Sequence, residues 1–242
     1  MTPERYAKIC AVLDKRQPDL TVVADEVHKG RNMAAIVRTC DAVGIPKIYS
    51  VVPEAGYNPY RGTALGTTKW VEVALCQALV TPLDALKNQG FQIVSTALEP
   101  SARDYREVDF TQPTALVMGN EKRGISDTAR AMTDVFVTIP MVGMVESLNV
   151  SVAAAIILNE ALHQRRRVGM LDQPRLPKAT YERLFFRWAH PQVAAFCDER
   201  DLPYPPIAAD GEIADPVGWH SMIKDKAIKH NAMNTKVTTD NA

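Results

Sequence analysis

Two polar residues, Asn32 and Arg38, lie in a stretch that is otherwise mostly small or apolar and could act on an anionic substrate. The spacing of apolar residues predicts a helix over 32–43. Six residues turn a helix by roughly 240°, so the two side chains point in different directions. A guanidinium among apolar neighbours is stable when an anionic group meets it. A side chain that extends along the helix to solvent explains Arg38 equally well.

A loop and a helix start carry the other candidates. Glu121 lies in the loop 119–124, which follows an apolar strand and whose two glycines permit a tight turn. The loop has the glycine spacing of a phosphate-binding loop, but Ile125 replaces its lysine, which argues against a nucleoside triphosphate. Ser147 is predicted to cap a long helix whose first turn contains Asn149, and such a terminus offers free amides to an anion. By itself, the loop is a weak signal that an ordinary strand-to-helix turn also explains, and spacing alone favours a capped core helix for the helix start.

The residue patterns typical of several other enzyme classes and of metal sites are absent from this sequence. No GxGxxG follows a strand, no GxSxG is present and the five histidines show no HExxH, so we expect no dinucleotide enzyme, serine hydrolase or bound metal. The four cysteines form no CxxC pair, which argues against a zinc framework or a secreted disulfide scaffold. The charged amino terminus and the lack of a long apolar stretch predict a cytoplasmic protein that does not enter a membrane.

Predicted strands and helices alternate through most of the chain. The strands are apolar throughout rather than at every second residue, which is typical of a mainly parallel sheet covered on both faces. We therefore predict an α/β domain at 20–168, a helical extension at 1–19, and a helical extension at 169–242 with a mobile end. The predicted strands are 21–27, 47–52, 71–75, 91–98, 114–119 and 135–140. The predicted helices are 3–16, 32–43, 81–90, 126–132, 148–167, 179–189 and 191–201.

The balanced total of 28 basic and 28 acidic side chains conceals a basic segment. Residues 163–187 contain seven arginines and lysines but two acids, whereas residues 198–215 contain six acids and one arginine. A basic patch can dock a phosphate backbone, although cations also suit the carboxyl end of a helix. Of the aromatic residues Phe185, Phe186 and Trp188, we expect at least two to be core. The candidate RNA-binding residues are Arg165, Arg166, Arg167, Arg175 and Lys178.

Together, the three polar segments are more specific than any one of them. NMAAIVR (32–38), LVMGNEKRGIS (116–126) and IPMVGMVESLNVSVAAAI (139–156) resemble, in this order, the three motifs of the SPOUT superfamily of methyltransferases. The resemblance is to its SpoU/TrmH branch of RNA ribose 2′-O-methyltransferases. FFRWAHPQVAAFCDERDLPYP (185–205) is similar to the C-terminal extension of branch members that methylate guanosine 18 of tRNA. The resemblance therefore extends over nearly the whole chain.

The resemblance implies a SPOUT fold, in which the C-terminal part of a mainly parallel sheet is threaded into a trefoil knot. It also implies a homodimer formed through the knotted region. The methyl donor would be S-adenosylmethionine, bound against the loops of the knot, with no metal required. The residues that match the family's cofactor contacts, or lie beside them, are Thr96, Met118, Gly119, Ile139 and Leu148.

The implied activity is 2′-O-methylation of a ribose in tRNA, specifically guanosine 18 of the D-loop. The family assigns proton removal to the arginine matched by Arg38. Because arginine hardly ever releases its proton, we expect Arg38 chiefly to grip the adjacent phosphate and stabilise the developing alkoxide. Asn32 and Asn149 would position Arg38 and the ribose, Glu121 would hold Arg38 or its loop, and Ser147 would cap the helix. Methylation of ribosomal RNA and non-catalytic RNA binding by the same fold stay open as alternatives.

Overall fold

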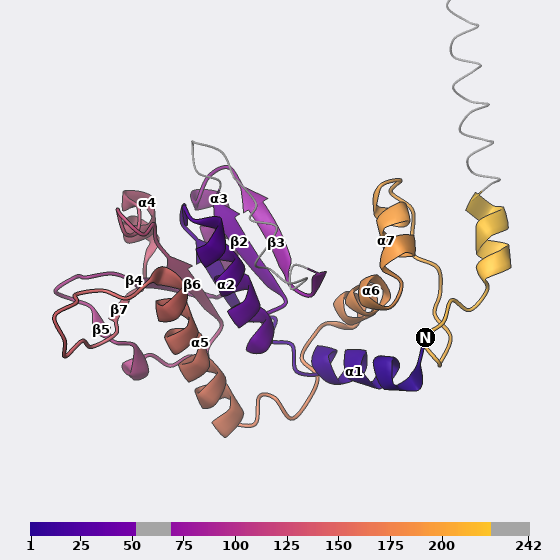
Figure 1. Cartoon of the computed structure of the whole chain (residues 1–242), viewed down its shortest axis with the longest axis horizontal. Coiled ribbons are helices and arrows are strands. Elements are labelled where there is room, and N and C mark those ends of the chain that lie inside the picture. The colour runs from indigo at the N-terminus through magenta and orange to yellow at the C-terminus, as the bar shows by residue number, and fades with distance from the viewer. Residues whose placement is uncertain (52–68, 224–242) are drawn as a thin grey trace, which may run out of the picture. The chain divides into compact units, whose positions relative to one another are not determined.

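The computed structural model describes residues 1–51 and 69–223 (Figure 1). It divides into two compact units, one of residues 12–176 and one that joins residues 1–11 to the chain from Pro177 onward. The helices are α1 (Pro3–Leu13), α2 (Gly30–Ala42), α3 (Val80–Asn88), α4 (Asp127–Met132), α5 (Val150–Arg167), α6 (Lys178–Ala189) and α7 (Pro191–Asp198). The strands are β1 (Leu20–Ala24), β2 (Lys47–Val51), β3 (Glu72–Cys76), β4 (Gln92–Thr96), β5 (Arg103–Asp104), β6 (Thr114–Met118) and β7 (Val135–Thr138).

The strands of the described residues form one sheet in the order β3-β2-β1-β6-β4-β7-β5. Each neighbouring pair is parallel, which confirms the mainly parallel sheet. Strand β5 was not predicted, because a strand of two charged residues carries no apolar signal. The trefoil knot stays a prediction.

Helices cover both faces of the sheet, which explains why its strands are apolar throughout. In β1, Val22 and Ala24 belong to a core cluster that includes residues of α2 and α5. The intervening Val23 belongs to a second cluster that includes residues of α3 and α4. Successive side chains of a strand point to opposite faces, so the two clusters lie on opposite sides of the sheet. Figure 1 shows α2 and α5 side by side.

The sheet gathers four loops at one edge. Strands β1, β6, β4 and β7 are consecutive neighbours and run in the same direction, so their carboxyl ends meet there. The loops begin after Ala24, Met118, Thr96 and Thr138. Open parallel sheets bind their ligands at this edge. The polar segments 116–126 and 139–156 lie at or directly after these strand ends, and the segment 32–38 begins in the first turn of α2, the helix that follows β1.

The other unit is helical. Phe185, Phe186 and Trp188 are all buried there, so the expectation that at least two are core is confirmed. Two contacts join α1 to α6. The Arg5 guanidinium donates to the Trp188 carbonyl at 2.8 Å, and the ring of Tyr6 packs edge-on against that of Phe185. Residues 216–223, which begin the tail predicted to be mobile, form a further helix. The rest of that tail lies outside the described residues. Within the described part of the chain, no helix has the length and apolar character to span a bilayer.

Candidate active site

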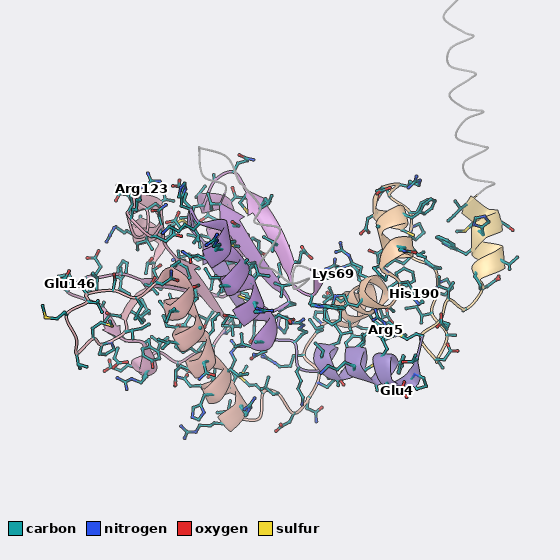
Figure 2. The ribbon with its side chains drawn as sticks, in the orientation of Figure 1. Glu4, Arg5, Lys69, Arg123, Glu146 and His190 are labelled. Carbon is teal, nitrogen blue, oxygen red and sulfur yellow. The ribbon has the colours of Figure 1, made fainter. Side chains whose placement is uncertain are left out.

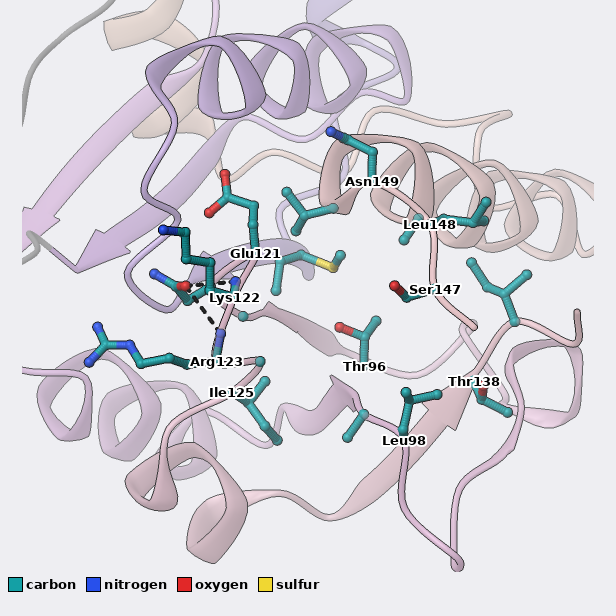
Figure 3. A pocket seen from close by; sticks show the side chains of 18 of the residues that line it. Thr96, Leu98, Glu121, Lys122, Arg123, Ile125, Thr138, Ser147, Leu148 and Asn149 are labelled. Atoms are coloured by element: carbon teal, nitrogen blue, oxygen red, sulfur yellow. Dashed lines mark hydrogen bonds between the residues drawn. The ribbon is translucent and has the colours of Figure 1, made fainter. Parts of the chain in front are cut away.

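A cavity of about 610 Å³ opens at the carboxyl edge of the sheet (Figure 3). Its walls come mainly from the ends of β4, β6 and β7 and from the first turn of α5. Arg123 and Glu146 lie on the two loops that border it, after β6 and after β7 (Figure 2). The residues predicted to contact the cofactor all line this cavity, and their binding role stays a prediction. They are Thr96, Met118, Gly119, Ile139 and Leu148.

The loop after β6 turns back on itself and forms one wall of the cavity. Asn120 and Gly124 exchange backbone hydrogen bonds of 2.8 and 2.9 Å. At Gly119, a Cβ atom would lie only 2.4 Å from the carbonyl carbon of Gly124, so no larger residue fits without moving the backbone. The Asn120 side chain accepts from the Lys122 amide at 2.9 Å and donates to the Glu26 carbonyl at 2.9 Å. The glycine spacing that resembled a phosphate-binding loop therefore serves this tight turn.

Three predicted catalytic residues form a hydrogen-bonded chain across the site. The Asn32 side-chain amide donates to Glu121 Oε1 at 2.6 Å. The Asn149 amide donates to Asn32 Oδ1 at 3.1 Å. These contacts are possible because α2 packs along α5, so that the starts of both helices lie together at the sheet edge. The network thereby joins all three motif segments.

Glu121 holds the start of α2 rather than Arg38. Its carboxylate accepts from the backbone amides of His28 at 2.9 Å and Lys29 at 3.1 Å, in addition to Asn32. Burial by itself would raise the pKa of this carboxyl group, but these hydrogen bonds together hold the pKa below its ordinary value. Glu121 is therefore a fixed negative charge and a poor proton acceptor at neutral pH.

The cap of α5 corrects one expectation. The helix begins at Val150, so Asn149 and not Ser147 is its N-cap, and the side-chain Oδ1 of Asn149 accepts from the Ser151 amide at 2.9 Å. Ser147 lies two residues before the cap, in the irregular segment between β7 and α5, and it lines the cavity. Its hydroxyl is thus available to a ligand.

Arg38 lies apart from the other predicted catalytic residues. Glu121, Ser147 and Asn149 line the cavity and Asn32 is bonded to two of them, whereas the exposed Arg38 is not part of the lining. The helix geometry gives the reason, because six residues of α2 carry Arg38 roughly 240° round the axis from the buried Asn32. Arg38 can therefore act only on a group that approaches from outside the cavity.

The predicted RNA-binding residues have different surroundings. Arg165 is fully buried and donates to Asp19 Oδ1 at 2.7 Å and to the Phe110 carbonyl at 2.7 Å. Arg175 makes two hydrogen bonds of 2.8 Å to the same carboxylate of Asp19. The exposed members of the predicted set are Arg166, Arg167 and Lys178.

Some residues that line the cavity were not predicted from the sequence. Lys29 and Lys122 border the cavity beside Glu121, and Leu98 lies at its outer lip. Their position is what could have indicated a place in the site, since each lies within a few residues of a strand's carboxyl end. Within the described residues, no three His, Cys, Asp or Glu side chains are grouped as a metal site requires.

Known proteins resemble this chain over most of its length. The model of the SpoU rRNA Methylase family matches residues 19–159, and that described as SpoU, rRNA methylase, C-terminal matches residues 163–216. An Escherichia coli (strain K12) protein named tRNA (guanosine(18)-2'-O)-methyltransferase is 44% identical over 92% of this chain and 98% of its own length.

Solved structures agree with the sequence matches. The crystal structure of the A. aeolicus TrmH/SpoU tRNA modifying enzyme has a TM-score of 0.74 and 43% identity, over 78% of this chain and 97% of that one. The SpoU methyltransferase AviRb from Streptomyces viridochromogenes, solved with the cofactor AdoMet, has a TM-score of 0.56 and 28% identity over 62% of each chain. These matches also confirm the fold class that the motifs implied. The chain therefore belongs to the SpoU methylase family.

Proposed function

We propose that this protein transfers a methyl group from S-adenosylmethionine to the ribose 2′-oxygen of guanosine 18 in tRNA. The observation that carries the proposal is a cavity lined by residues of two motif segments, with Glu121, Ser147 and Asn149 on its wall, to which the third segment is joined by the hydrogen bonds of Asn32. The E. coli relative, which this chain matches over 98% of its length, is named for this reaction. A tRNA substrate implies that the protein works in the cytoplasm.

The cavity suits the cofactor in size and lining. Its volume of about 610 Å³ is within the range of roughly 300–1,000 Å³ typical of small-molecule sites. Leu98, Ile139 and Leu148 offer apolar surface to an adenine ring, and the hydroxyls of Thr96 and Ser147 offer polar contacts. When bound, S-adenosylmethionine supplies an activated methyl group on its sulfonium sulfur.

The protein must orient a ribose hydroxyl and help to remove its proton. The Asn149 amide carries two N–H groups, of which one donates to Asn32, so the other can donate to the ribose. Glu121 fixes Asn32 in place but, with its lowered pKa, does not accept the proton. The exposed Arg38 binds the phosphate beside the target ribose and stabilises the developing alkoxide, while that phosphate or water takes the proton.

The same proposal includes a homodimer and a tRNA-docking surface. The loop after β7 exposes Val142, Met144 and Val145, which a second copy packed on the knotted region would cover. The exposed cations Arg166 and Arg167 of the sheet-containing unit contact the tRNA backbone, and the exposed Lys178 of the helical unit does so separately. Arg165 and Arg175 are left out of the docking residues because Asp19 already binds them.

Methylation of unmodified tRNA with labelled S-adenosylmethionine, followed by nucleoside analysis and mapping of the modified position, tests the function. We expect 2′-O-methylguanosine at position 18. Methylation confined to ribosomal RNA would favour that alternative. Cofactor binding without methylation of either RNA would favour a non-catalytic role.

The role of Arg38 has its own test. Because its side chain is exposed, Arg38→Ala should leave folding and cofactor affinity unchanged while kcat falls by about 10²–10⁴-fold. Calorimetry with S-adenosylhomocysteine and single-turnover methylation separate the two effects. A pH–rate profile of Arg38→Lys with full activity and a lowered apparent pKa would instead indicate a general base at this position.

A further inference from the structure

Four cationic side chains line the cavity, and two of them are already neutralised. Arg123 pairs with Glu26 at 2.5 Å, and Arg130 pairs with Glu99. The other two, Lys29 and Lys122, are exposed. Neither lysine forms an ion pair with a carboxylate of the described residues.

The two lysines flank Glu121 on a fixed backbone. The Lys29 amide donates to Glu121 Oε1 at 3.1 Å, and the Lys122 amide donates to Asn120 Oδ1 at 2.9 Å. Figure 3 shows the Lys122 side chain beside that of Glu121 at the border of the cavity. The Glu121 carboxylate accepts from three neutral N–H donors and forms no ion pair with either ammonium group. Two long cationic side chains thus extend from fixed backbone positions beside Glu121.

Two exposed cations attract an anion, and an RNA substrate would bring one. A phosphodiester is covalently joined to every internal ribose, so a ribose held by Asn149 places a phosphate within reach of a neighbouring lysine. Lysine suits this task because its ammonium is a point charge on a long flexible stem and tolerates different phosphate orientations. Contacts to phosphate fix the register of a nucleic acid without reading its bases.

We propose that Lys29 and Lys122 together bind one of the two phosphodiesters adjacent to the methylated ribose, while Arg38 binds the other, and that the lysines so position that ribose at the cavity. This inference rests on the proposed function and adds a phosphate-binding pair to it. The pair lies beside Glu121, whereas Arg38 lies on a different side of α2 from Asn32. Arg38 and the two lysines would therefore hold the substrate backbone from separate directions.

The test compares Lys29→Gln, Lys122→Gln and the double variant in the full chain with unmodified tRNA at several salt concentrations. Each single variant should raise KM for tRNA by about 3–10-fold, and kcat should stay within about twofold. The slope of log KM against log salt concentration should fall by about 0.7–0.9 for each lysine removed. Lys122→Arg, which keeps the charge, should restore KM.

Lys47→Gln is the matched control. It removes the same charge from the start of β2, at the opposite edge of the sheet, and should leave the salt slope unchanged. An unchanged salt slope in both pocket variants, with an active wild type, would overturn the phosphate-binding pair and leave the methyltransferase proposal intact. A wild type that does not methylate tRNA would overturn the function itself. A weakened affinity for S-adenosylhomocysteine would assign the lysines to the cofactor carboxylate and also overturn the pair.

Discussion

Helix α5 carries a polar network at each end, and the two networks differ in how many hydrogen-bonding groups they leave free for a ligand. At its start, Asn149, Asn32 and Glu121 form a chain whose members line or adjoin an open cavity. Near its end, Arg165 and Arg175 both bind Asp19. Arg165 is fully buried and also bonds the carbonyls of Phe110 and Gln112, so every direction of its guanidinium is used.

The comparison separates a ligand-binding site from a network with a structural role. We call this second network of Asp19, Arg165 and Arg175 the clasp. Both networks join α5 to a segment next to β1, and both contain charged groups. The clasp at Asp19 satisfies its charges internally, as buried ion pairs must. The network at Asn149 leaves amide and hydroxyl groups directed to a ligand-sized space. The charge of a residue therefore says less about function than the hydrogen-bonding capacity that folding leaves unused.

The largest effect is expected in the clasp. Arg165→Met leaves Arg175 to pair with Asp19 but removes the guanidinium that donates to the Phe110 carbonyl, and it leaves the Gln112 carbonyl with the Thr114 hydroxyl as donor. We expect the free energy of unfolding to fall by about 3–5 kcal/mol, measured by urea denaturation followed by circular dichroism. The neighbouring exposed Arg166→Gln should change stability by less than about 0.5 kcal/mol. Equal losses in the two variants would contradict a structural role specific to Arg165.

An intermediate effect is expected at Glu121. In Glu121→Gln the new NH₂ group replaces one carboxylate oxygen, so it faces either the His28 amide, which binds Oε2, or the N–H groups of Lys29 and Asn32, which bind Oε1. We expect a loss of about 1–3 kcal/mol in the free energy of unfolding at neutral pH.

The pH dependence of this loss has a definite sign. Because the pKa of Glu121 is lowered in the folded state, its contribution is present above its ordinary pKa of 4.5 and is lost as the pH falls through the lowered value. The difference in unfolding free energy between wild type and Glu121→Gln should therefore narrow in acid. A difference that stays constant from neutral pH into that range would show that the carboxylate charge is not what matters.

The smallest effect is expected at the cap of α5. Asn149→Ala should cost about 0.5–2 kcal/mol of stability because the Ser151 amide loses its acceptor. Ser147→Ala should cost less than about 0.5 kcal/mol, since Ser147 lies outside the helix. Thermal unfolding of the two variants compares them directly. A larger cost for Ser147→Ala would restore Ser147 as the cap.

The sequence predicted the sheet well because its signals are local. Apolar strands covered on both faces, such as Leu20–Ala24, can be identified from composition alone. The cap of α5 was misplaced because Ser147 and Asn149 are both good cap residues, and only the fold decides where the helix begins.

The two polar networks were harder to predict from the sequence, since they depend on contacts between residues that are distant along the chain. The three motifs identified the family, yet the bond between Asn32 and Glu121 spans 89 residues and no local pattern encodes it. Arg165 resembled a surface cation in a run of three arginines, but it is the one whose side of α5 faces the core. Lys29 and Lys122 were missed because a lone lysine in a loop has no signature.

A crystal structure of the protein with S-adenosylhomocysteine bound is the most direct test of whether the space beside the Asn149 network is the reaction centre. We expect the ligand among Thr96, Ile139 and Leu148, with its sulfur directed to the side where Ser147 and Asn149 lie. A ligand bound elsewhere on the chain, with this space still empty, would contradict the account.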